Sequence, residues 1–221
     1  SLALASLLLS GGYGTYAAAV TSSHFCSAER QYRTPLEYGC QRTPTAQWTA
    51  TASGAVIVTS SVRPGPRVVR VTVGKVVDKG IKDANNMGAA MAPAAYLTLK
   101  AHFEDTGLEP SYYDLIVTGD LGQLGHEIVS DFFARDGVSL SNYNDCGLLL
   151  FDREEQDVHA GASGCGCSAS VLCGYLLPGL LAGRWKRILF CPTGALHSPT
   201  ATMQGESIPG ICHAIALEGG T

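Results

Sequence analysis

The fold of this chain is decided by the stretch His159-Ala160-Gly161-Ala162-Ser163-Gly164-Cys165-Gly166-Cys167-Ser168. Small residues dominate it, and a charge-free run follows that ends just before Arg184, Lys186 and Arg187. A glycine-rich turn that opens a helix leaves backbone N–H groups unpaired, and these can hold an anion or a polarised carbonyl. The alternative is that its glycines only permit a tight chain reversal and close packing of the helix.

The charge-free run that follows, Cys165 to Gly183, predicts a buried helix from Cys165 to Ala182. A membrane span is the alternative, because no charged residue interrupts the run. Pro178 and several glycines break its apolar character, however, and its length lies at the lower limit for crossing a bilayer. We therefore expect this helix to pack inside the protein.

Outward from this run, short apolar segments alternate with longer helical patterns. This alternation is typical of an α/β fold with a largely internal sheet. Strands are expected at 15–22, 53–59, 67–77, 112–118, 148–151, 187–191 and 211–217, and helices at 1–10, 88–102, 123–135 and 165–182.

Composition limits the possible functions. The chain has 221 residues, a hydrophobic fraction of 46% and a formal net charge of -4, which argues against a general nucleic-acid binder. Its 8 cysteines include no C-x-x-C pair, so we expect buried free thiols in a reducing compartment and no metal site. The first residue is Ser1 and the first methionine is Met87, which suggests a fragment or a processed product.

Polar residues follow several of the expected strands. In open α/β sheets ligands bind at the carboxyl ends of strands, where His24, Asp120, His159 and Cys191 are expected here. The pair His126-Glu127 lacks the second histidine of a zinc protease, and the chain contains neither a P-loop nor a nucleophile elbow. The residues alone thus indicate a candidate site without indicating a reaction.

Several longer motifs resemble the stage V sporulation protein AD family, from Ser1 to Glu218. They are Thr21-Ser22-Ser23-His24, Ala28-Glu29-Arg30-Gln31, Val73-Gly74-Lys75-Val76, Ala90-Met91-Ala92-Pro93-Ala94-Ala95, Thr118-Gly119-Asp120-Leu121 and Asn144-Asp145-Cys146-Gly147. The resemblance implies a thiolase-like α/β fold, with a mixed sheet and buried helices. It further implies that the chain is the C-terminal two thirds of its parent. Residues 1–80 would then end the N-terminal half, and residues 81–221 would form the C-terminal half.

The same resemblance implies a site that has lost its catalytic groups. His159 to Gly164 is similar to the thiolase loop that carries a catalytic histidine, and Cys191-Pro192-Thr193-Gly194 to the loop that carries a cysteine. Condensing enzymes have an asparagine or histidine where this chain has Asp120. An ionised aspartate only accepts hydrogen bonds and would repel an oxyanion. The family's nucleophile-type cysteine would fall before Ser1, so we expect neither a catalytic residue nor a cofactor.

The function implied by the resemblance is binding of dipicolinic acid, free or as its calcium chelate, in support of its uptake into the developing spore. Carboxylate oxygen suits calcium, whereas N–H donors suit the free acid. The alternatives are an acyl-transfer or condensing enzyme and a scaffold for membrane transport partners. We expect a homodimer that is soluble, peripheral to the spore inner membrane and associated with other stage V sporulation membrane proteins. The candidate ligand-binding residues are His24, Asp120, His159, Ser163, Gly164 and Cys191.

Overall fold

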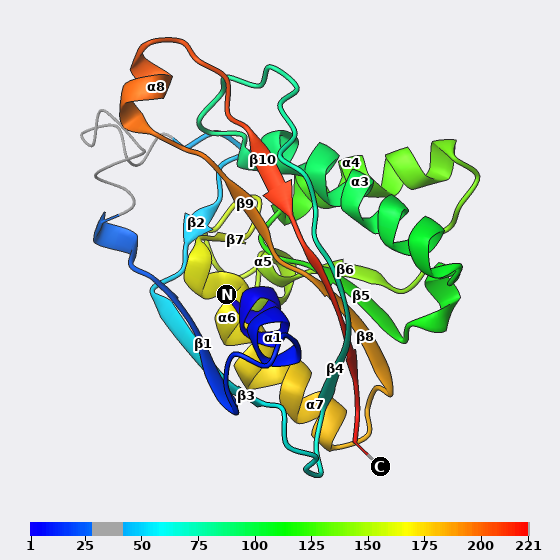
Figure 1. Ribbon diagram of the computed structural model, residues 1–221. Coiled ribbons are helices and arrows are strands. Elements are labelled where there is room, and N and C mark those ends of the chain that lie inside the picture. Colours follow the sequence, from blue (N-terminus) through cyan, green and yellow to red (C-terminus); the bar gives the residue numbers. More distant parts are fainter. Residues whose placement is uncertain (28–41, 221) are drawn as a thin grey trace.

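A five-stranded mixed sheet forms the centre of the computed structural model, which describes residues 1–27 and 42–220 (Figure 1). Its strand order is β4-β11-β8-β5-β6, and β11 runs antiparallel to both of its neighbours while β5 runs parallel to β6 and β8. The strands are β4 (Arg67–Thr72), β5 (Leu115–Thr118), β6 (Tyr143–Asp145), β8 (Arg187–Cys191) and β11 (Ala214–Glu218). The expected α/β class with a mixed sheet is confirmed.

The central strands are apolar on both faces because helices cover both. On one face, α3 (Met87–Thr106) and α4 (Gly122–Arg135) enclose Ile116 and Leu189 in one core. On the other face, the helical run that begins with α6 (Cys165–Val171) packs on Val117, Ile188 and Phe190 in a second core. Burial on both faces requires continuous apolar strands, which explains why these segments lack polar alternation.

The helix predicted from the charge-free run is present between the sheets, but only its inner face is buried, and Cys165, Tyr175 and Leu181 are exposed. It consists of α6 (Cys165–Val171), a π-helical turn η3 (Leu172–Leu176) and α7 (Leu177–Leu181). Figure 1 shows it between the five-stranded sheet and the pair β1–β3. Within the described residues, no helix combines the length and the apolar character that crossing a bilayer requires.

The antiparallel pair β1 (Tyr16–Ser23) and β3 (Ala52–Thr59) forms a smaller sheet against α1 (Leu2–Ser10) and α6. Its residues alternate between the core and solvent, and Val20 and Ile57 remain exposed on its outer face. The strand expected at 15–22 is therefore present, but it is not internal to the sheet on both faces. Two shorter pairs complete the sheets, β2 (Trp48–Thr49) with β7 (Ala162–Ser163), and β9 (Thr193–Ala195) with β10 (Gly210–Cys212).

The structure corrects the expected elements at three places. Residues 148–151 lie mostly in a short helix, α5 (Cys146–Leu150), because the Asp145 carboxylate caps it by accepting the Gly147 N–H. The strand expected to reach Val77 ends at Thr72. The strand expected over 211–217 is split at His213 into β10 and β11.

The described elements without a counterpart among the expected ones are β2, β6, β7, β9, η2 (Pro110–Tyr112) and α8 (Pro199–Met203). Because Tyr112 belongs to η2, the strand expected over 112–118 begins only at Leu115. The motif Ala28-Glu29-Arg30-Gln31 lies outside the described residues. The division of the chain at residue 80 stays a prediction, although β4 pairs with β11 from the other side of that boundary.

Candidate functional site

Asp120, two residues after the end of β5, connects its own loop to those of Gly164 and Thr193 by hydrogen bonds. Its Oδ2 atom accepts the Gly164 N–H at 2.9 Å, at the start of α6. Its Oδ1 atom accepts the Thr193 hydroxyl at 2.9 Å, and the same hydroxyl oxygen accepts the Asp120 N–H at 3.1 Å. Both carboxylate oxygens are therefore used inside the protein, at the point where β5, α6 and β9 meet.

A second buried carboxylate, Asp145, holds the Asp120 loop in place. Its Oδ1 atom accepts the N–H groups of Gly122 and Gly147 at 3.0 and 2.9 Å. Its Oδ2 atom accepts the Leu121 N–H at 3.0 Å and the Thr118 hydroxyl at 2.7 Å. Because its side chain is fully buried, these donors replace the water that would otherwise solvate the carboxylate.

The two carboxylates share one electrostatic environment. Burial, with Asp145 nearby, raises the pKa of Asp120 to about 6, although the Gly164 N–H acts in the opposite direction. Burial also raises the pKa of Asp145. At pH 7 Asp120 is thus still ionised, and it places a negative charge directly in front of the glycine-rich turn.

The donors of this turn are occupied, contrary to the expectation that they would be unpaired. Gly164 donates to Asp120, and the Gly166 N–H donates to the Ser23 hydroxyl oxygen at 2.8 Å. Gly164 has a φ of +97°, and a Cβ atom there would lie 3.0 Å from Ser23 Oγ. Glycine is therefore required at this position for both conformation and space, and the anion that the turn holds is the protein's own Asp120.

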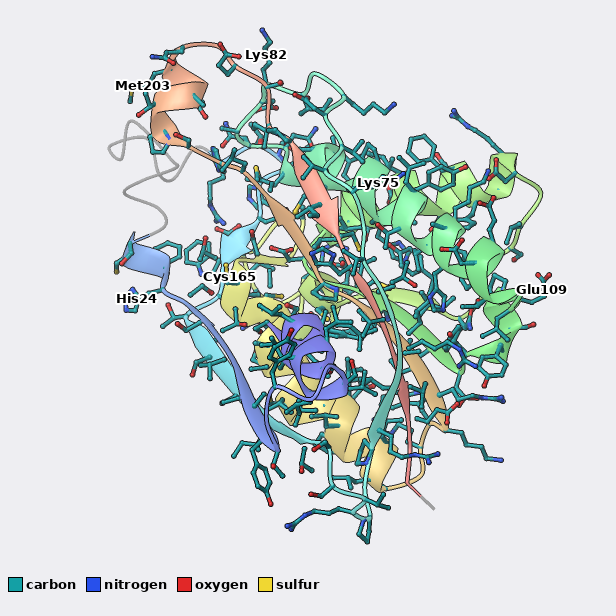
Figure 2. The ribbon with its side chains drawn as sticks, in the orientation of Figure 1. His24, Lys75, Lys82, Glu109, Cys165 and Met203 are labelled. Carbon is teal, nitrogen blue, oxygen red and sulfur yellow. The ribbon has the colours of Figure 1, made fainter. Side chains whose placement is uncertain are left out.

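The structure brings Asp120, Ser163 and Gly164 together but places the other predicted residues elsewhere. His159 Nδ1 lies 2.7 Å from the Thr43 carbonyl oxygen, and its Nε2 lies 3.1 Å from a carboxylate oxygen of Asp157. His24 is exposed immediately after β1 (Figure 2). Cys191 is fully buried at the end of β8, where burial and the neighbouring Cys212 raise the pKa of its thiol.

A cavity of about 220 Å³ opens beside this network, between α6, the pair β1–β3 and the junction of β8 with β9. Leu172, Phe190 and Ile211 supply apolar walls, and the lining contains no Lys, Arg, Asp or Glu. None of the predicted site residues lines it. The residues of interest that do line it are Thr21, Cys165, Ser168, Thr193 and His213.

Two signals in the sequence could have indicated these residues. Cys165, Ser168 and Leu172 share one face of a helix by their spacing, a face on which a hydroxyl is unexpected if it is buried. His213 is a single polar residue inside an otherwise apolar segment. Such a residue is usually read as part of the core, which is why it did not enter the predicted site.

Within the described ranges, no three His, Cys, Asp or Glu side chains are grouped so that they could hold a metal ion. The carboxylates that do meet, Asp120 and Asp145, already accept hydrogen bonds with both oxygens.

With this geometry in view, the comparisons with known proteins are specific. The family model described as Stage V sporulation protein AD matches residues 1–218. The Stage V sporulation protein AD of Bacillus subtilis (strain 168) is 46% identical over 220 residues. The chain belongs to the stage V sporulation protein AD family. The match covers 99% of this chain and 64% of the length of the relative. The family resemblance inferred from the motifs is thus confirmed.

Solved structures confirm the thiolase-like fold of this family member. A 3-oxoacyl-[acyl-carrier-protein] synthase III from Aquifex aeolicus has a TM-score of 0.55 at 12% identity, covering 98% of this chain and 62% of that one. The corresponding FabH from Pseudomonas aeruginosa has a TM-score of 0.56 at 12% identity, covering 100% and 64%. OleA from Xanthomonas campestris has 0.53 at 16%, covering 97% and 59%. At these identities the likeness establishes the fold alone.

Proposed function

We propose that the chain forms part of a binding protein for dipicolinic acid, free or as its calcium chelate, that supports uptake of the acid into the developing spore. Membership of a sporulation family supports the context. The observation that carries the proposal is the cavity beside Asp120, because it is open and mostly apolar while Asp120 is engaged in hydrogen bonds and Cys191 is buried.

The state of these groups favours binding over catalysis. Asp120 occupies the position at which the resemblance places an oxyanion-stabilising asparagine or histidine, and it offers no hydrogen to donate while ionised. Cys191 stays a thiol because burial raises its pKa, and the thiolate is the reactive form of cysteine. Neither residue is thus prepared for the acyl transfer of a condensing enzyme.

The cavity suits a small flat ligand. Its volume lies below the range of about 300–1,000 Å³ that is typical of sites for drug-sized molecules. A pyridine ring can lie between Leu172, Phe190 and Ile211, with its carboxylates directed to the polar part of the lining. The calcium chelate has no formal charge, so an uncharged lining is compatible with it as well.

The proposal is tested by calorimetric titration of the 221-residue chain with dipicolinate, with and without calcium. We expect saturable binding at one site per chain. Incubation with acetyl-CoA, followed by mass spectrometry, should give no acyl-enzyme and no condensation product. Turnover above about one per minute, against an enzyme median near 10 per second, would instead establish the condensing-enzyme alternative.

A scaffolding role is the second candidate, favoured by the outer face of the β1–β3 pair. Tyr16, Val20 and Ile57 expose 58%, 59% and 73% of their surface there, which is typical of a contact surface when such residues are grouped. We propose that a homodimer or a stage V membrane partner covers this face and keeps the protein peripheral to the spore inner membrane. Light scattering that gives only a monomer at all concentrations would contradict the dimer.

A further inference from the structure

Two polar atoms of the cavity lining are left unused by the part of the chain that the structure describes: Ser168 Oγ and His213 Nε2. Apart from the exposed thiol of Cys165, the other polar side chains of the lining have partners. Thr193 bonds to Asp120, Thr21 Oγ1 lies 3.0 Å from Ser1 Oγ, and Cys173 Sγ lies 3.7 Å from the Ala55 carbonyl oxygen. Uncommitted polar atoms in a mostly apolar cavity are the groups that orient a ligand.

His213 is held in one tautomer by the backbone of a distant loop. The Gly74 N–H donates to His213 Nδ1 at 3.1 Å, so the neutral ring must carry its proton on Nε2. The backbone N–H of His213 donates to the Pro192 carbonyl oxygen at 3.3 Å, at the position between β10 and β11. Burial lowers the pKa of His213, which keeps the ring neutral at pH 7. The cavity thus has one N–H donor that is oriented in advance.

Ser168, in α6, supplies a hydroxyl to the same cavity. In a helix a serine hydroxyl commonly bonds to the carbonyl four residues earlier. Here the Ser168 hydroxyl makes no hydrogen bond to the Gly164 carbonyl oxygen or to any other described residue. Ser168 also lies on the same helix face as Cys165 and Leu172, which line the cavity with it. Its hydroxyl is therefore available to a ligand.

We propose that Ser168 and His213 bind one carboxylate of an aromatic acid whose ring lies against Leu172, Phe190 and Ile211. The proposal rests on the proposed function, because it identifies the residues that recognise the acid in that cavity. It differs from the site expected from sequence, since His159 lies outside the lining. A carboxylate accepts hydrogen bonds from both donors at once, one at each oxygen.

The test compares variants of the 221-residue chain that leave the fold intact. Ser168→Ala removes the hydroxyl at a helical position. His213→Asn keeps a side-chain oxygen that can accept the Gly74 N–H but removes the donor at Nε2. His159→Ala is the matched control, because it removes an imidazole outside the cavity. Thermal melting curves establish that each variant is folded, and calorimetry then measures its affinity for dipicolinate.

We expect Ser168→Ala and His213→Asn each to weaken dipicolinate binding by about ten- to a hundredfold, with melting temperatures close to that of the unmodified chain. The double variant should lose less than the product of the two single effects, because both residues bind the same group. His159→Ala should bind as the unmodified chain does. Unchanged affinity in folded Ser168→Ala and His213→Asn would overturn the proposal.

Titration with picolinate and benzoate separates this inference from the proposed function. If dipicolinate does not bind but one of these acids does, and Ser168→Ala weakens it, the site assignment stands and the assignment of dipicolinate fails. If none of the three acids binds the unmodified chain, both are wrong.

Discussion

Two polar regions lie on either side of the first turn of α6, and they differ in how far their hydrogen bonds are satisfied. Around Asp120 and Asp145 every carboxylate oxygen has a donor from the chain itself. In the adjoining cavity, Ser168 and His213 each keep a group free within the described residues. The difference shows that buried carboxylates such as Asp120 and Asp145 can have a structural role, while the neighbouring Ser168 and His213 remain available to bind a ligand.

The largest expected effect comes from breaking the satisfied region at its centre. Asp145→Ala would leave buried N–H groups of Leu121, Gly122 and Gly147 without an acceptor. We expect the free energy of unfolding to fall by about 3–5 kcal/mol, measured by urea denaturation and tryptophan fluorescence.

Asp152→Ala is the matched control, since this exposed aspartate accepts backbone N–H groups only at a surface turn. Its loss should be at most about 1 kcal/mol. Equal losses for the two variants would show that the buried network contributes nothing special to stability.

The next effect is a dependence on pH. Burial raises the pKa of Asp120 in the folded state to about 6, above the ordinary value of an aspartate, so the folded state binds the proton more tightly than the unfolded state does. This contribution to the free energy of unfolding is full at low pH and is lost as pH rises from about 4 to above 6, by on the order of 3 kcal/mol. Asp120→Asn should remove that slope, as measured by denaturation at several pH values.

Asp136 provides a control with the opposite sign. The Lys100 ammonium lowers the pKa of Asp136, so its contribution to stability is present at neutral pH and is lost on acidification. Asp136→Asn should therefore flatten the acid side of the stability curve. If Asp120→Asn behaved in the same way, Asp120 would not be the buried, destabilised carboxylate described above.

A smaller effect is expected from two glycines of the same helical run. Gly164→Ala should cost about 1–3 kcal/mol, because φ is +97° and Ser23 Oγ would lie 3.0 Å from the new Cβ. Gly174→Ala meets no atom within 4 Å and should stabilise by about 0.4–1 kcal/mol. Melting curves compare the two, and a loss of stability in both would show that the strain is not specific to the Asp120 region.

The smallest effect concerns the rate of thiol modification in the cavity. Cys165 is exposed and lines the cavity, whereas Cys26 is exposed outside it. Dipicolinate should slow alkylation of Cys165 and leave Cys26 unaffected, as followed by mass spectrometry of peptides. Equal protection of both thiols would indicate a change that is not local to the cavity.

Much of the fold could be predicted from apolar patterning. The strands near 53–59 and 187–191 and the helix of 165–182 were predicted from their runs of apolar residues, although only the second of these strands is fully buried along most of its length. The strand predicted at residues 148–151 was wrong, because the same apolar residues are compatible with a strand or a helix. The Asp145 cap favours the helix, and among the described elements no strand pairs with residues 148–151 to favour the strand.

The candidate site was predictable only in part. Asp120 and Gly164 do meet, but a sequence does not reveal whether a carboxylate and an N–H group bind each other or a ligand. The orientation of the His213 ring depends on a hydrogen bond from Gly74, 139 residues away along the chain, so no local sequence pattern predicts it. Polar groups left over after folding become visible only when all their possible partners have been placed.

The π-helical turn at Leu172–Leu176 sets the rotational phase between the two ends of the helical run. Its far end is anchored, since Leu176 and Leu180 are buried and Gly179 packs against Trp185. A helix advances by about 100° per residue, so deleting Gly174 would convert the turn to regular α-helix and rotate the preceding segment by that amount. Ser168 would leave the cavity wall, although no residue of that wall had changed. The number of residues in this turn therefore determines which side chains of α6 face the cavity. Insertions or deletions in the turn would alter ligand binding more than many substitutions.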